Sequence, residues 1–186
     1  MKTYTAKDRF LCFFRKEWLV VIPIYLFFLI PLTAGVAFLC RFLDKHLGLP
    51  DLINSPYNLI IFIILILVGG FIVFWCYTYL ILEGQGGPVP PFSPDTRKLV
   101  TTGPYALVRH PSIIGKLLGV IGLGFLFKSI TFTFIMVPLL LAGSLFLNVR
   151  YQEKIAEQRL GEEYRKYKKQ VPMLIPRIKN IILRGG

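Results

Sequence analysis

Hydrophobic residues fill four stretches of the chain, and polar residues gather between these stretches and at both ends. Residues 18–40, 57–82 and 130–149 contain no charged side chain, and residues 111–127 contain only Lys116. A helix needs about 20 apolar residues to cross a bilayer, so each stretch is long enough or nearly so. The pattern predicts an all-α, polytopic integral membrane protein with about four transmembrane helices.

Small residues inside the stretches predict where the helices approach one another. Gly115, Gly119 and Gly122 recur at three- and four-residue spacing, so they share one face of the third span. We expect this face to pack against residues 142–144 of the fourth span as a helical hairpin, because small side chains let helix backbones come close. The glycine pair at 69–70 offers a similar close approach in the second span.

Four polar segments lie outside the spans. Residues 1–17 predict a basic interfacial helix, and residues 41–56 predict a loop that contains Gly and Pro turn residues. The central loop opens with a Gly- and Pro-rich stretch at residues 83–95, which predicts either a simple connector or an ordered loop over a pocket. We favour the ordered loop, since long irregular loops are often functional. From Arg150, apolar residues recur at mostly three- to five-residue steps up to Val171, which predicts an amphipathic helix.

The distribution of charge predicts the orientation of the chain in the membrane. The sequence has 22 Lys and Arg against 10 Asp and Glu. The basic residues gather before the first span, in the central loop and after the last span, whereas the two remaining loops carry only Arg41, Lys45 and Lys128. The positive-inside rule therefore predicts that both termini and the central loop lie in the cytoplasm. Contact with anionic lipid head groups accounts for the charge, and we expect no nucleic-acid partner.

The three cysteines lie far apart in the sequence and form no CxxC motif. Cys40 and Cys76 fall in apolar stretches, so we expect free thiols that pack as small hydrophobic side chains, without a disulfide or a metal site. Only two histidines occur and no acidic residue lies inside a predicted span, which argues against a proton-coupled pump.

The candidate chemistry lies where the central loop meets the third span. Pro111 is a favoured first residue of a helix, and a helix start carries unpaired N–H groups and a partial positive charge. Arg109 and His110 directly precede it, and together these groups form an anion site. A second interpretation remains open, in which Arg109 contacts lipid phosphate and His110 caps the helix. Lys116, further along this span, either reaches to the membrane surface or joins the polar site, and we favour the first interpretation.

A second polar cluster follows the fourth span. Arg150 and Glu153 lie just beyond it, so a hairpin of the third and fourth spans would bring them near Arg109 and His110. A carboxylate in that position can bind a cation or hydroxyl groups. The alternative is an ordinary ion pair at a solvated helix start.

Between residues 85 and 179 the chain carries an ordered series of short motifs. They are Leu99-Val100-Thr101-Thr102-Gly103-Pro104-Tyr105, Arg109-His110-Pro111-Ser112 with Gly115, Glu153, Leu160-Gly161-Glu162-Glu163-Tyr164 with Tyr167, and Val171-Pro172 with Pro176. In this order they resemble the isoprenylcysteine carboxyl methyltransferase family, and the related membrane phospholipid methyltransferases share much of the pattern. The first two spans are similar to the family only in being apolar.

The resemblance implies a membrane-embedded site for S-adenosylmethionine that faces the cytosol. We assign Arg109 and Arg150 to catalysis, the second as the nearest candidate for a family arginine tied to the methyl acceptor. Tyr105 would contact the sulfonium by a cation–π interaction and Glu153 by its charge. No metal is implied. The cofactor-binding residues that carry over are Lys98, Leu99, Val100, Tyr105, His110, Pro111, Ser112, Ile113, Gln152 and Glu153.

Three positions depart from the family pattern. Ile113 stands where the family usually has Tyr, and Gln152 replaces the first Glu of a pair. The family Arg lies slightly before Arg150, where this chain has Asn148. The cofactor assignment survives these departures, and the identity of the acceptor stays open.

The resemblance thus implies a membrane-embedded, S-adenosylmethionine-dependent methyltransferase acting on a lipophilic acceptor such as an isoprenylcysteine-type carboxylate. Its partners would be a lipophilic or lipidated substrate and the lipids of a cell or inner membrane. We expect one domain, residues 1–186, in which 1–82 form a two-span scaffold and 83–186 a methyltransferase-like core. Three alternatives remain open: a phospholipid N-methyltransferase-like enzyme, a reductase-like relative that uses NADPH, and a non-catalytic membrane scaffold.

Overall fold

The computed structural model describes residues 5, 7, 11, 16–85 and 96–176, with the side chains at 16–17 and 147–148 left out. Most of the predicted interfacial helix at 1–17, the Gly- and Pro-rich part of the central loop at 86–95 and the side chain of Asn148 therefore lie outside the described residues. Within these bounds the chain contains helices and turns and no strand, which confirms the all-α prediction.

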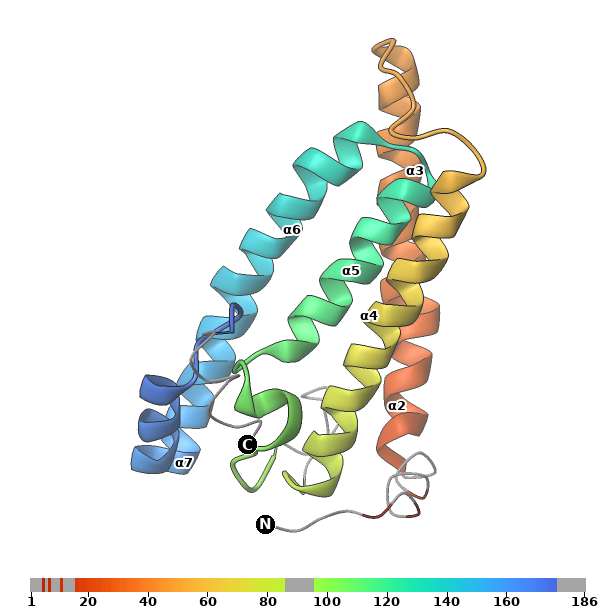
Figure 1. Cartoon of the computed structure of the whole chain (residues 1–186). Helices are drawn as coiled ribbons and strands as arrows, with labels where there is room; N and C mark the ends of the chain where they lie inside the picture. The colour runs from red at the N-terminus through yellow and green to blue at the C-terminus, as the bar shows by residue number, and fades with distance from the viewer. Residues whose placement is uncertain (1–4, 6, 8–10, 12–15, 86–95, 177–186) are drawn as a thin grey trace.

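The helices form a bundle of long, roughly parallel or antiparallel segments (Figure 1). Three continuous helical segments are long and apolar enough to cross a membrane, and the shorter apolar helix α5 lies among them, in keeping with a polytopic membrane protein. The first segment comprises α2 (Lys16–Ile24), η1 (Tyr25–Leu29) and α3 (Ile30–His46), the second is α4 (Tyr57–Leu82), and α5 spans Pro111–Leu126. The last comprises η3 (Phe132–Met136), α6 (Val137–Gly143), η4 (Ser144–Val149) and α7 (Arg150–Gln170).

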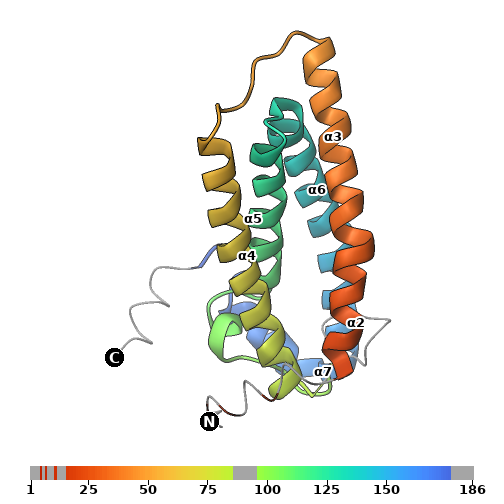
Figure 2. The same ribbon diagram turned by 90° about the vertical axis from the view of Figure 1, so that its right-hand side faces the viewer.

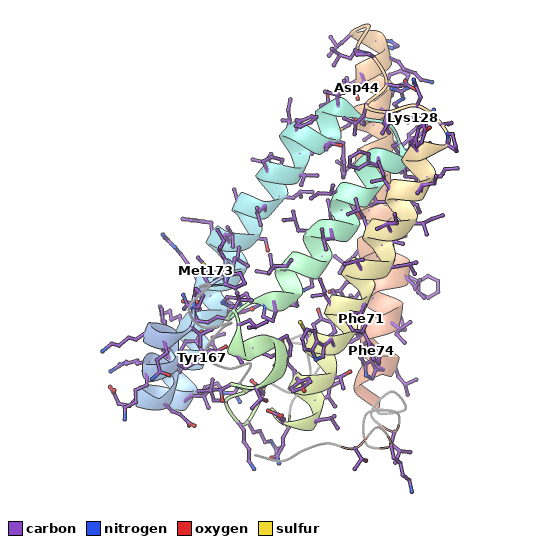
Figure 3. All side chains as sticks on the ribbon, in the orientation of Figure 1. Asp44, Phe71, Phe74, Lys128, Tyr167 and Met173 are labelled. Carbon is purple, nitrogen blue, oxygen red and sulfur yellow. The ribbon has the colours of Figure 1, made fainter. Side chains whose placement is uncertain are left out.

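The first segment remains helical to His46, so the predicted loop at 41–56 begins later than expected. The reason is a buried carboxylate that joins two spans. Asp44 accepts hydrogen bonds from the Ser129 hydroxyl at 2.6 Å and from the Thr131 N–H at 3.2 Å, where the last span begins. Asp44 and Lys128 lie at the upper end of the bundle in Figure 3, far from Tyr167 in its lower half.

Three π-helical turns, η1, η3 and η4, interrupt the first and last segments, and two of them, η1 and η4, border a cavity. η1 lies between Pro23 and Pro31, and η4 directly precedes the polar helix α7. Proline removes a backbone donor, and π turns in helices often accompany functional sites because they redirect side chains. Both turns contribute side chains to the cavity described below, Tyr25 and Leu29 from η1 and Ser144 from η4.

The predicted packing partner of the third span is wrong. The glycine face of α5 packs against α4, where a Cβ added to Gly115 would lie 2.6 Å from the Gly69 carbonyl oxygen. In the described structure nothing lies within 4 Å of a Cβ added to Gly143. α4 and α5 run side by side (Figures 1 and 2), whereas α6 packs much less closely on α5. The sequence identifies the small residues, but both α4 and the last span contain them. Their spacing alone does not show which of these two helices packs against α5.

The contact between α4 and α5 predicts different effects for two adjacent glycines. A Cβ added to Gly69 would lie 2.5 Å from the Gly115 carbonyl oxygen, whereas nothing lies within 4 Å of one added to Gly70 in the described structure. We expect Gly69→Val to lower the free energy of unfolding by about 1–3 kcal/mol, the usual cost of overpacking. Gly70→Val is the matched control. Thermal unfolding in detergent micelles measures both, and equal midpoints would contradict this packing.

Candidate functional site

The segment before α5, residues 96–110, is hydrogen-bonded to the C-terminal end of α4. The Arg97 N–H donates to the Gly84 carbonyl at 2.7 Å, and the Thr102 hydroxyl donates to the Glu83 carboxylate. Gly103 then adopts a φ of 56°, and a Cβ there would lie 2.5 Å from the ring of Tyr79. Only glycine fits both the conformation and the space, so this residue starts the short 3₁₀ helix η2 (Gly103–Ala106).

The predicted amphipathic helix is present as α7, but it is not continuous. Gly161 has φ 57° and ψ −130°, which breaks the helix. The chain turns there, so Lys168 reaches back to Glu153 and Glu157, with N–O distances of 2.9 and 2.7 Å. The doubled-back end of α7 is the darkest blue ribbon of Figure 1. A lone glycine in a helical pattern is weak evidence for such a break, so periodicity alone predicted one helix.

The chain beyond α7 closes on the start of α5. The Arg109 N–H donates to the Pro172 carbonyl at 2.9 Å and the His110 N–H donates to the Met173 carbonyl at 3.1 Å. The Tyr167 hydroxyl donates to the Tyr105 carbonyl at 2.7 Å. These bonds fix the backbone of the Arg109-His110 pair from the C-terminal side.

A buried carboxylate ties the start of α5 to both parts of α7. Glu153 is 8% exposed and accepts hydrogen bonds from Arg109 Nη1 and from Lys168. His110 Nε2 lies 3.2 Å from the same carboxylate oxygen that Arg109 contacts. This confirms the prediction that Glu153 approaches Arg109 and His110.

Glu153 lies on the polar helix beyond the apolar part of the last span, which ends at Val149. Burial alone would raise the pKa of Glu153. Hydrogen bonds from His110 and Lys168 and the charge of Arg109 outweigh that effect and lower the pKa to about 2. The carboxylate is therefore ionised at neutral pH.

These contacts surround a cavity of about 490 Å³, within the range of roughly 300–1,000 Å³ typical of small-molecule sites. Its wall comes from the 96–113 segment, from Lys116 of α5, from α7 and from the first, second and last spans. Nine of the residues predicted from the sequence line it: Lys98, Leu99, Val100, Tyr105, Arg109, His110, Ser112, Ile113 and Gln152.

The other three predicted residues lie elsewhere. Glu153 is buried beside Arg109 and His110, and Pro111 begins α5 without facing the cavity. Arg150 is exposed, and its guanidinium lies 4.9 Å from the centre of the Phe146 ring, one helical turn earlier. The structure therefore does not bring Arg150 to the cavity.

Several lining residues were not predicted as site residues. Tyr25 and Leu29 come from the first segment, so the apolar half of the chain contributes part of the wall. Lys116 also lines the cavity, which differs from the expectation that it reaches to the membrane surface. Four of these residues could have been found from the sequence, because each is a polar side chain within an apolar span: Tyr25, Tyr77, Lys116 and Ser144. The remaining unpredicted lining residues are Leu80, Thr96, Tyr151, Ile155, Ala156, Arg159, Leu160, Tyr164 and Tyr167.

Neither a disulfide nor a metal cluster contributes to this site in the described part of the chain. Cys40 and Cys76 are buried free thiols, and Cys12 lies outside the described residues. Within the residues described, no three His, Cys, Asp or Glu side chains gather as metal ligands.

A bundle of apolar helices with a cavity at one end describes a polytopic membrane protein, and the comparisons with known proteins identify its family. The phospholipid methyltransferase family model matches residues 57–159, more than half of the 186-residue chain. The chain belongs to the phospholipid methyltransferase family, which includes the isoprenylcysteine carboxyl methyltransferases.

Two curated relatives are each similar over 56% of the chain. The nickel-cobalt-cadmium resistance protein NccN of Alcaligenes xylosoxydans xylosoxydans is 33% identical over 56% of this chain and 43% of its own length. The cobalt-zinc-cadmium resistance protein CzcN of Cupriavidus metallidurans is 34% identical over 56% of this chain and 42% of its own. The alignments thus span less than half the length of these relatives. No solved structure matches the chain.

The buried carboxylate predicts a pH-dependent stability. The pKa of Glu153 is lowered from 4.5 to about 2, so its stabilising effect is complete above pH 4.5 and is lost as pH falls toward 2. Glu153→Gln should therefore unfold at a lower temperature than the wild type at pH 7, and the difference should shrink between pH 4.5 and 2.

Glu162→Gln is the control, because the Glu162–Arg165 pair is exposed and contributes little. The midpoint of thermal unfolding as a function of pH measures all three proteins. A constant difference between wild type and Glu153→Gln across this pH range would contradict the lowered pKa.

Proposed function

We propose that this protein is an S-adenosylmethionine-dependent methyltransferase whose cofactor binds in the cavity beside Arg109 and His110. The observation that carries the proposal is the convergence of separate motifs on one cavity. One motif-bearing segment, from Lys98 to Ile113, and the distant helix α7 line the same space, the first through Tyr105, Arg109 and His110 among others and the second through Gln152. In our proposal this end of the protein faces the cytoplasm, as the positive-inside rule suggests.

The residues present fit this cofactor in charge and in shape. The Nε of Arg109 is buried and has no hydrogen-bond partner in the part of the chain described, so a donor is available for a ligand carboxylate. His110 and the start of α5 add positive charge at the same place. Leu99, Val100 and Leu160 provide an apolar wall that suits a purine ring.

In this proposal each polar group has a defined task. The cofactor would supply an electrophilic methyl group on a sulfonium sulfur. Arg109 and His110 hold its carboxylate, and Glu153, which does not face the cavity, positions both of them. The role predicted for Glu153 thus becomes positioning, with no direct contact to the sulfonium. Positioning and exclusion of water account for most of the acceleration in an in-line displacement.

The acceptor in this proposal is lipophilic and enters from the bilayer. Leu29 lines the cavity and is 42% exposed, so the wall formed by the first span is open to the apolar surroundings. An isoprenylcysteine-type carboxylate is the acceptor we favour, because an ionised carboxylate needs no base. A phospholipid amine is the alternative acceptor, and its methylation requires loss of a proton.

Isothermal titration of the purified protein with S-adenosylhomocysteine tests the cofactor assignment. The wild type should bind, and His110→Ala and Glu153→Ala should each bind at least about tenfold more weakly. A hydrogen bond to a charged group contributes about 1.5–3 kcal/mol, which corresponds to that factor. Arg165→Ala, on the exposed face of α7, should bind like the wild type.

Absence of binding to the wild type, or equal binding to all three variants, would refute the proposal. A thermal shift with NADPH and none with S-adenosylhomocysteine would favour the reductase-like alternative. A protein that binds neither nucleotide would fit the membrane scaffold.

A further inference from the structure

The cavity has two chemically different ends. At one end lie loop residues, among them Lys98 and Leu99. At the other end lie Tyr25, Lys116 and Ser144, which come from three apolar helices. Lys116 is five residues beyond the start of α5, which places its Cα about 7.5 Å deeper along the helix axis than Pro111. We call this part of the cavity the membrane end.

Lys116 is the charged residue of the membrane end. Its Nζ lies 5.6 Å from the centre of the Tyr77 ring and 6.0 Å from that of the Tyr25 ring. Within the residues that the structure describes, it forms no ion pair, whereas Arg109 is paired with Glu153 and Lys168 with Glu157. A cation at membrane depth without a counter-charge is costly, and cation–π contacts offset that cost only in part.

The remaining lining of the cavity supplies no counter-charge. Among the described residues that form its wall there are the cations Lys98, Arg109, Lys116 and Arg159, and no Asp or Glu. The nearby carboxylates of Glu153 and Glu157 are engaged by Arg109 and Lys168. Among the described residues no carboxylate is left to pair with Lys116, so an anionic ligand is a fitting partner.

A pair of hydroxyl groups stands beside Lys116. The hydroxyl oxygens of Tyr25 and Tyr77 lie 2.8 Å apart, so one donates to the other. The hydroxyl that accepts keeps its own hydrogen to donate. An ammonium and a hydroxyl donor at one site can together hold an anion, because hydrogen bonds to a charged acceptor are the stronger kind.

We propose that Lys116, assisted by the Tyr25–Tyr77 hydroxyl pair, binds an anionic group of the methyl acceptor and makes the enzyme select anionic amphiphiles over neutral or cationic ones. This inference rests on the proposed methyltransferase function and adds a specificity-determining residue to it. The anion is a carboxylate or a phosphate, held where the first span, α4 and α5 meet. The apolar chain of the acceptor then extends toward Leu29 and the bilayer.

Four ligands with the same farnesyl chain test the proposal. They are N-acetyl-S-farnesyl-cysteine, its methyl ester, farnesyl phosphate and farnesylamine. Dissociation constants are measured with the full-length protein in lipid nanodiscs, and empty nanodiscs give the background. We expect one or both anionic ligands to bind the wild type at least tenfold more tightly than the ester and the amine, and the tighter of the two identifies carboxylate or phosphate as the preferred group.

Two substitutions assign this preference to Lys116. Lys116→Met should abolish the tenfold preference and Lys116→Arg should keep most of it. Lys154→Met, which removes an exposed cation of α7 away from the cavity, should leave the preference unchanged. Thermal unfolding of each variant verifies that it is folded, and Tyr25→Phe provides a milder second variant that should weaken anion binding.

Separate titrations with S-adenosylhomocysteine distinguish this inference from the proposed function. Unchanged affinity in Lys116→Met, together with lost anion preference, supports an acceptor subsite. Equal anion binding by wild type and Lys116→Met would overturn the inference, as would a loss of S-adenosylhomocysteine binding in Lys116→Met, which would place Lys116 in the cofactor site. A wild type that prefers anionic amphiphiles but does not bind S-adenosylhomocysteine would refute the methyltransferase proposal alone.

Discussion

The buried carboxylate of Glu153 is the interaction on which the candidate site depends. It joins Arg109 and His110, at the start of α5, to Lys168, on the doubled-back end of α7. Loss of one partner from a buried ion pair is strongly destabilising, because the remaining charges are left without compensation. Here three cationic or titratable groups would be left together. The same carboxylate thus holds the tertiary structure and orients the two side chains that face the cavity.

The cavity exists because α5 packs closely against α4 but not against the last span. The glycine contact between α4 and α5 brings their backbones together at Gly69 and Gly115, and the buried Asp44 joins the first and last segments at the opposite end of the bundle. α6 packs much less closely on α5 than α4 does. The 96–113 segment and α7 close the cavity that results, and the motif-bearing residues meet there. The predicted contact between α5 and the small residues 142–144 is therefore not needed to form the site.

Hydropathy predicted the spans well, since burial in a bilayer requires long apolar runs, and Pro111 located the start of α5 because proline fits a helix start. Features that depend on tertiary contacts were harder to predict. The helix break at Gly161 requires φ 57°, and a glycine in a periodic pattern does not reveal its φ. We expected Arg150 near the site because it is close to Glu153 in the sequence. In the structure its side chain is exposed and lies against the ring of Phe146. The walls contributed by the first two spans were missed because their tyrosines look like ordinary interfacial aromatic residues.

Pairing of charges makes the two ends of the cavity different, and this difference bears on the order in which the proposed cofactor and acceptor would lie along it. At the loop end, the charge of Arg109 is largely balanced by Glu153, which suits a cofactor that carries a carboxylate together with an ammonium and a sulfonium. At the membrane end, Lys116 has no balancing carboxylate among the described residues, which suits an anion. An anionic acceptor and a sulfonium donor attract each other most strongly in a cavity shielded from water. Their charges vanish together if a carboxylate takes the methyl group, and a low-dielectric membrane edge favours that loss of charge.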